Sequence, residues 1–388
     1  MYTDTLPGAT AAQIIPEVLP ASENVTIYQR SPNWVIPRMD GPISPFRQFV
    51  YRYLPPIRWR IRAAQMDFRE SFHSAVFDPN SAFADQIKEW CAGSLRAQIP
   101  GREDLWEKLT PGYSPGCKRV IISDDYYPAL ADPKSTLETR DIVRITESGI
   151  EVKNGEGGAE HYEHDVLVLA TGFRTVEFLF PIKITGANGR TLEDIWSNGA
   201  EALYGTTVPS LPNFGMFYGP NTNLGHNSIV LMIEAQSRYL NGLVGAVLDA
   251  RNRGERIGVM PKKEKTEKYN EEMQDTLNKS SFADPNCGSW YKNKDGKITN
   301  NWSGTVVEYQ KLLEKVDWED FEIVGEGGVN KGSASGVVFG SGKKETKVGR
   351  VVEETTISNT GLLVGGLGVM AAGAAWVCRE NLTKRLRR

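Results

Sequence analysis

The sequence is poor in the residues that build disulfide frameworks and metal centres. It contains only four cysteines and four histidines among 388 residues. The cysteines, at positions 91, 117, 287 and 378, form no CxxC pair, and no histidine stands at a zinc-ligand spacing from them. Closely spaced cysteines are typical of disulfide-rich domains and of zinc sites. We therefore expect no metal site, no disulfide framework and a reducing compartment.

A surplus of basic charge is also absent. The chain has 45 Lys and Arg against 48 Asp and Glu, a net charge of -3. Nucleic-acid-binding proteins carry a basic surplus, so we expect no nucleic-acid partner. Residues 1–6 contain no apolar run, so no secretory signal is expected. With 40% hydrophobic and 24% charged residues, the composition is that of a folded protein, which excludes wholesale disorder.

Long uncharged runs are missing except near the C-terminus. No charged residue occurs in 355–378, and five basic residues follow in 379–388. Because about 20 helical residues span a bilayer, residues 357–378 are predicted to form a membrane anchor and 379–388 a basic tail. Small residues four apart (Gly361/Gly365, Ala371/Ala375) favour close helix contact and would allow a homodimer. The alternative is a Gly/Ala-rich tail that is too weakly hydrophobic to insert.

The rest of the chain divides into segments of different composition and predicted secondary structure. Residues 1–38 predict a helix and then a strand at Val25–Tyr28, whereas 39–116 are rich in aromatics and arginine and predict helices. Residues 117–323 predict strands at 119–123, 141–145 and 166–170, then a long amphipathic helix at 228–250. Residues 324–356 are rich in Gly, Ser and Lys and predict a flexible linker. Strands alternating with helices favour an α/β fold with a parallel sheet.

A turn of small residues opens the first predicted helix. It consists of Gly8, Ala9, Thr10 and Ala11, with Gln13 following, and the next strand ends about 20 residues later, the spacing of a dinucleotide site. Arg30 stands at that strand end in place of an acidic residue, and an arginine there favours the 2′-phosphate of NADP. The full G-x-G-x-x-G is absent here, so a helix start without a ligand is the alternative.

Four segments, taken together, resemble the flavin-containing and Baeyer–Villiger monooxygenases. They follow the order of that family and cover about residues 8–321. The segments are Gly8–Gln13 with Tyr28–Arg38, Gly116–Arg119 with Ser123–Leu130, Asp165–Phe173, and Gly219–Ile229.

The resemblance implies a two-dinucleotide-binding, Rossmann-like α/β fold with FAD and NADP as cofactors. Residues 1–38 with 117–160 would form the NADP-binding domain, 39–116 a helical insertion, and 161–323 the C-terminal part of the FAD domain. The N-terminal FAD half of the family is expected to be missing. The implied reaction transfers one oxygen atom of O₂ to a ketone or heteroatom of a small organic substrate through a C4a-peroxyflavin. A non-catalytic, membrane-tethered remnant without FAD is the alternative, and an NADP-dependent reductase without flavin is a weaker one.

The resemblance also assigns roles to single residues. Arg119 matches the catalytic arginine, which stabilises negative charge on the flavin. Arg30 and Ser31 would hold the 2′-phosphate of NADP, with Lys118 as a second cation. The further cofactor-binding residues are Gly8, Ala9, Thr10, Ala11, Gln13, Ala170, Thr171, Gly172, Asn221 and His226.

Two expectations concern membranes. Residues 45–62 alternate arginine with aromatic residues, which we interpret as a solvated or cofactor-facing amphipathic helix, with a membrane-surface helix as the alternative. The predicted anchor would hold the globular part on the cytosolic side of the endoplasmic reticulum or of the mitochondrial outer membrane.

Overall fold

The structure is a computed structural model that describes residues 8–155, 157–325 and 344–349. Its contacts divide the chain into two compact units, residues 1–40 with 71–350, and residues 41–70 with 351–388. The predicted anchor, its small-residue face and the basic tail lie outside the described residues. Among the helices that the structure describes, none is long and apolar enough to cross a membrane.

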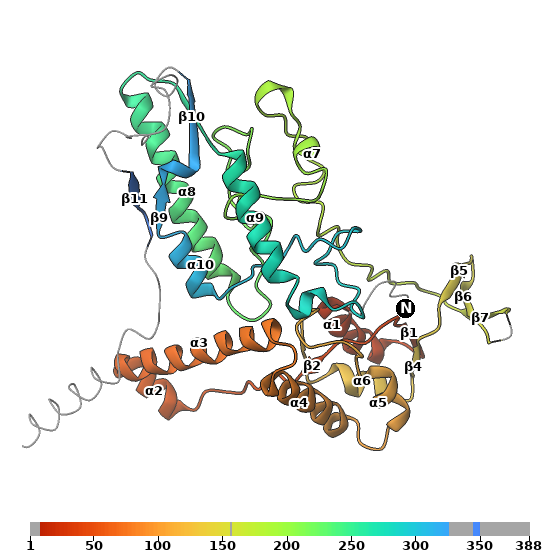
Figure 1. Cartoon of the computed structure of the whole chain (residues 1–388). Coiled ribbons are helices and arrows are strands. Elements are labelled where there is room, and N and C mark those ends of the chain that lie inside the picture. Colours follow the sequence, from red (N-terminus) through yellow and green to blue (C-terminus); the bar gives the residue numbers. More distant parts are fainter. Residues whose placement is uncertain (1–7, 156, 326–343, 350–388) are drawn as a thin grey trace, which may run out of the picture. The chain divides into compact units, whose positions relative to one another are not determined.

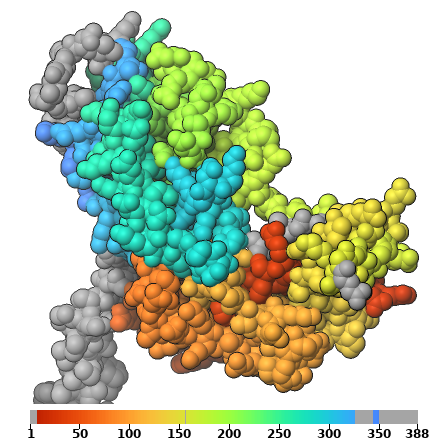
Figure 2. All heavy atoms as spheres, turned by 45° about the vertical axis from the view of Figure 1, so that its right-hand side comes forward, coloured from red at the N-terminus to blue at the C-terminus, as the bar shows by residue number. Residues whose placement is uncertain are grey.

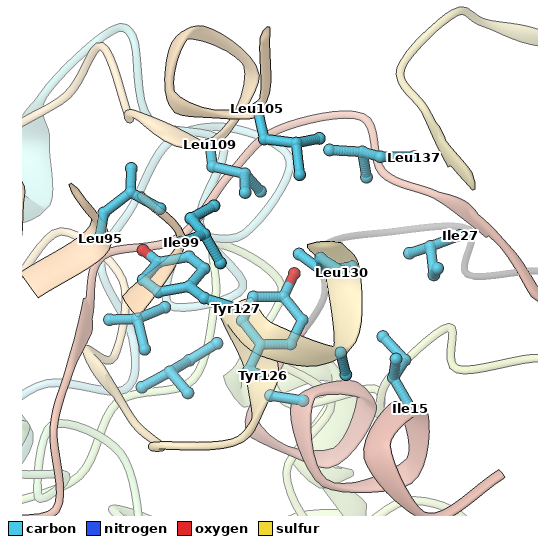
Figure 3. Packing of buried hydrophobic residues seen from close by; sticks show 14 of the residues in the cluster. Ile15, Ile27, Leu95, Ile99, Leu105, Leu109, Tyr126, Tyr127, Leu130 and Leu137 are labelled. Carbon is cyan, nitrogen blue, oxygen red and sulfur yellow. The ribbon is translucent and has the colours of Figure 1, made fainter. Parts of the chain in front are cut away.

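The first unit begins with a helix followed by a parallel pair of strands (Figure 1). Helix α1 (Ala9–Val18) leads to strand β1 (Val25–Tyr28), which pairs in parallel with β4 (Ser135–Glu138) in the register Val25 to Ser135. The predicted helix, strand and parallel pairing are confirmed. Helices α4 (Ala82–Gln98), α5 (Glu103–Leu109) and α6 (Tyr126–Ala131) contribute to the same core. The buried side chains labelled in Figure 3 come from these six elements and the residues between them.

The other strands of this region correct the predicted sheet. β2 (Val35–Ile36) and β3 (Ile121–Ile122) form a second parallel pair. The strand predicted at 141–145 exists as β5 (Ile142–Ile145), but it belongs to an antiparallel sheet with β6 (Gly149–Lys153) and β7 (Ala159–Glu163).

The strand predicted at 166–170 is wrong. These residues carry no regular structure, and Val166 and Leu169 are 69% and 61% exposed. A strand exists only where a neighbouring strand accepts and donates its backbone hydrogen bonds, and no strand in the described part of the chain pairs with this segment. An apolar sequence alone does not supply that partner.

A disulfide joins Cys117 to Cys287, which corrects the expectation of no disulfide framework to the extent of one bond. The two residues are 170 positions apart, so no spacing rule indicated the bond. They meet because both are buried in one apolar cluster with Trp34 and Tyr113. Cys91 is buried as a free thiol, and burial raises its pKa to about 12.

The C-terminal part of this unit is built around the predicted long helix, which is confirmed as α8 (Ile229–Asn252). α9 (Lys263–Leu277) packs beside residues 290–300, where Gln274 Nε2 donates to the carbonyl oxygen of Ile298 at 2.8 Å, and both segments lie side by side in Figure 2. β8 (Ile257–Pro261) pairs antiparallel with β10 (Phe321–Gly325). The shorter elements are α7 (Leu192–Ile195), α10 (Val306–Leu312) and β9 (Lys315–Asp317).

The predicted linker 324–356 contains a strand, so it is not flexible throughout. β11 (Glu345–Lys347) pairs antiparallel with β9, and Trp318 Nε1 donates to Thr346 Oγ1 at 2.9 Å. A Cβ on Gly242 of α8 would lie 2.5 Å from Val348 Cγ1, so the glycine leaves room for that valine. The contacts of Thr346 and Val348, both half-buried, therefore hold this segment against the C-terminal part of the unit.

The second unit contains α2 (Pro45–Tyr53) and the first turns of α3 (Pro55–Phe77). Ser44 caps α2, because its Oγ accepts a hydrogen bond from the backbone N–H of Arg47 at 3.3 Å. Pro45 at the first helical position needs no N–H partner. No residue of α2 is buried. The helices predicted for residues 39–116 are thus present.

Candidate functional site

A group of cations gathers after strand β1, and we call Arg30, Ser31 and Lys118 the basic cluster. Lys118 Nζ donates to Ser31 Oγ at 3.0 Å, although 87 positions separate the two residues. Burial and, to a smaller extent, the positive charge of Arg30 together lower the pKa of Lys118 to about 8. Among the described residues neither cation forms an ion pair. Two cations without a direct ion pair and a hydroxyl form a site that suits an anion.

The buried lysine is held by its surroundings. Lys118 is 5% exposed and follows Cys117, whose disulfide fixes the backbone at that point. Its ammonium lies 4.7 Å from the centre of the Tyr113 ring. Tyr113 is in turn anchored near the cluster, because its Oη donates to the carbonyl oxygen of Pro32 at 2.8 Å. Arg30 is exposed, so an incoming anion can reach it.

The start of α1 supplies backbone donors. Gly8 is the N-cap, with extended backbone and no side-chain hydrogen bond to the helix, and the first turn holds no acidic residue. Gly8, Ala9, Thr10 and Gln13 are exposed, whereas Ala11 is 1% exposed and packs inward. The N–H groups of a first helical turn lack partners within the helix and attract anions. Four of the five predicted residues are thus accessible at this end.

Arg119 lies in a second group of side chains, near two tyrosines. It is exposed, and its charge acts on both Tyr218 and Tyr291. Burial raises the pKa of Tyr218, and raises that of Tyr291 to about 12, while the Arg119 guanidinium opposes both shifts. Tyr218 Oη donates to Asn223 Oδ1 at 2.7 Å. The structure therefore places Arg119 next to the loop that precedes α8.

That loop, 219–228, contains two predicted site residues with different surroundings. Asn221 is 2% exposed, and its Nδ2 donates to the carbonyl oxygens of Ile298 and Asn301 at 2.8 and 2.9 Å. These bonds make Asn221 a structural anchor of the loop. His226 faces His73, with ring centres 5.6 Å apart, and burial together with the smaller effect of His73 lowers the pKa of His226 to about 4. His226 is therefore neutral at physiological pH.

The segment Ala170–Gly172 is irregular. Thr171 and Gly172 are exposed, and Gly172 has a φ of 85°, a conformation that favours glycine. A Cβ on Gly172 would meet no atom within 4 Å. The glycine is thus required by its backbone conformation and leaves open space beside it.

Several residues of the site carried no signal in the sequence. His73, Tyr113 and Tyr291 belong to none of the recognised motifs, and they reach the site through the fold. Tyr218 directly precedes the Gly219–Ile229 segment, so that motif could have included it.

The geometry defines an α/β dinucleotide-binding protein, and comparison with known proteins gives its family. No protein-family model matches the chain. It is 47% identical over 369 residues to the FAD-binding monooxygenase ktnD of Aspergillus niger, covering 95% of this chain and 58% of that protein. It is 33% identical over 325 residues to a Baeyer–Villiger monooxygenase of Streptomyces coelicolor, covering 82% and 59%. The chain belongs to the flavin-dependent Baeyer–Villiger monooxygenase family, and the predicted resemblance is confirmed.

Solved structures agree on the fold. A complex of OTEMO with FAD and NADP matches with a TM-score of 0.67 at 21% identity, over 83% of this chain and 66% of that chain. Oxidised steroid monooxygenase bound to NADP matches with a TM-score of 0.66 at 21% identity, over 84% and 66%. The chain thus spans just under two thirds of the length of these proteins, and less than that of the curated relatives above.

Proposed function

We propose that this chain forms the NADP-binding part and one side of the FAD site of a monooxygenase. The enzyme would transfer one oxygen atom of O₂ to a ketone or heteroatom of a small organic substrate. The basic cluster carries the proposal, because Lys118 and Arg30 lie together and neither forms an ion pair among the described residues. Asp141, whose charge Arg30 feels, is itself paired with Lys153. Relatives named as FAD-binding and Baeyer–Villiger monooxygenases support the same assignment.

The donor set fits NADP. Arg30 and Lys118 supply two positive charges for a 2′-phosphate, and Ser31 supplies a hydroxyl that already bonds to Lys118. NAD has no phosphate there, so it would gain nothing from either cation. The exposed first turn of α1 supplies N–H donors for the pyrophosphate. These residues bind and orient the nicotinamide cofactor.

The residues present also fit one side of a flavin. FAD, when bound, supplies the redox chemistry that activates O₂. The first turn of α8 has no side-chain cap and no acidic residue, so its N–H groups are available to a flavin carbonyl. Arg119 would place a fixed positive charge beside the flavin ring, where negative charge develops on reduction. Gly172 leaves space for close approach.

Binding measurements on the purified chain test this proposal. Calorimetric titration should give tighter binding of NADPH than of NADH. The visible absorbance of oxidised flavin reports whether FAD is retained. Selective NADPH binding without flavin would favour the non-catalytic alternative for this chain. Equal affinity for the two nucleotides would contradict the assigned role of the basic cluster.

We also propose that residues 357–378 anchor the protein in the endoplasmic reticulum or the mitochondrial outer membrane, with the globular part in the cytosol. The uncharged run of the sequence supports this. Alkaline carbonate extraction of cells should leave the chain in the membrane pellet. Met370→Arg places a charge in the middle of the run and should move the protein to the supernatant. Extraction of the unchanged chain would contradict the proposal.

A further inference from the structure

Helix α2, which is labelled in Figure 1, carries a stripe of exposed apolar side chains. Phe46, Phe49 and Tyr53 are 75%, 57% and 58% exposed, and the rings of Phe49 and Tyr53 lie 4.7 Å apart. Successive residues of a helix are rotated by about 100°, so these three side chains, with Val50, lie on one face. Three large exposed rings on one side of a nine-residue helix form a surface that no other described residue of the chain covers.

Arginines flank this stripe on both sides. Arg47 and Arg52 lie about 110° to either side of the middle of the apolar face, by the same helical geometry. Both stay near the aromatic side chains: Arg47 lies 5.6 Å from the Tyr51 ring, and Arg52 5.6 Å from the Tyr53 ring. This is the pattern of a helix that lies in a membrane interface, with rings in the acyl region and guanidinium groups at the phosphates.

The charge of the whole segment fits the same partner. Residues 41–66 contain five arginines and no acidic residue. Since the chain has a net charge of -3, the rest of it carries -8. The start of α3 adds exposed Ile57 and Trp59, which are 43% and 49% exposed. Positive charge is therefore concentrated where the exposed apolar side chains are.

We propose that α2 and the first turns of α3 bind the surface of a membrane that contains anionic phospholipids. A planar anionic surface meets the apolar stripe and both arginine flanks at once. In a symmetric pair of chains joined through this face, the same arginines would meet each other and repel. The proposal does not rest on the C-terminal anchor.

Vesicle co-sedimentation of the full chain tests this surface. Every sample carries Met370→Arg, which prevents insertion of the C-terminal run and leaves α2 unchanged. The vesicles contain phosphatidylcholine alone or phosphatidylcholine mixed with phosphatidylserine. We expect binding to the mixed vesicles only, and we expect it to weaken as salt is raised.

Two substituted chains separate the contributions. Phe46→Gln with Phe49→Gln should weaken binding at least about tenfold, because the apolar contact is lost. Arg47→Gln with Arg52→Gln should weaken binding about 25-fold, since each basic residue near an anionic surface contributes about fivefold.

Matched control variants show whether the effects are specific to α2. Phe180→Gln with Ile182→Gln removes two apolar residues that are 62% exposed elsewhere, and Lys263→Gln with Lys268→Gln removes two exposed charges from α9. Both should bind as the parent does. Equal binding to the two kinds of vesicle would overturn the proposal. So would unchanged binding by the arginine variant, whose exposed substitutions preserve the fold, or a dimer that the phenylalanine variant dissociates.

Discussion

Replacing Lys118 by methionine separates a binding role from a structural one. Lys118 is buried, and its pKa is lowered to about 8, so the fold disfavours its charge. The pKa of Lys118 in the folded chain lies below that of an unfolded lysine. The charged Lys118 therefore destabilises the fold in full below about pH 8, and this cost shrinks as the pH rises above that value. Lys118→Met should therefore not lower the thermal stability of the ligand-free chain at pH 7. The same substitution should reduce NADPH affinity about tenfold or more, because a charge-assisted contact to phosphate is lost.

The pH dependence of NADPH binding tests the expected contribution of the Lys118 charge a second time. With a pKa of about 8, Lys118 is mostly charged at pH 7 and mostly neutral at pH 9. If the charged form binds, the Kd for NADPH should rise up to about tenfold between these values, while the Kd for NADH stays flat. The second pKa of a phosphate is about 6, so the 2′-phosphate does not titrate between pH 7 and 9.

The assay is calorimetric titration from pH 7 to 9, in buffers of different ionisation enthalpy. Binding at pH 8 to 9 should be accompanied by proton uptake, since the bound phosphate raises the pKa of Lys118. Lys88→Met, which removes a lysine of α4 that pairs with Asp85, is the matched control and should behave as the parent. The reasoning is refuted if Lys118→Met keeps the NADPH preference or the same pH profile.

Three other substitutions test the remaining features. Arg30→Ala should lower NADPH affinity about tenfold and leave NADH binding unchanged by titration, and a parallel loss of both would make Arg30 structural. Arg119→Ala, in a fusion that adds the FAD half of a family member, should keep NADPH binding but abolish product formation; full turnover would contradict its charge-stabilising role. Cys117→Ser should lower the free energy of unfolding by at most about 5 kcal/mol, because the disulfide closes a long loop and so restricts the unfolded chain. A reductant should produce the same loss in the parent chain and none in the variant, as followed by thermal unfolding.

The local elements could be predicted from the sequence because each depends on nearby residues. The start of α1, the bounds of β1 and the long helix α8 follow from small residues, short apolar runs and a helical period. Arg30 and Ser31 were found for the same reason, since they directly follow β1. Motif order over residues 8–321 was enough to indicate the family, which the comparisons confirm.

Only the tertiary structure decided which distant residues meet. It pairs Cys117 with Cys287, which nothing in the sequence indicated, and it brings Lys118 to Ser31, a grouping that the family resemblance implied but no spacing rule indicates. It also shows that the apolar run 166–170 is no strand, because strand formation depends on hydrogen bonds from another segment. Helical and turn preferences act within a few residues, whereas burial, ion placement and strand pairing depend on partners far along the chain.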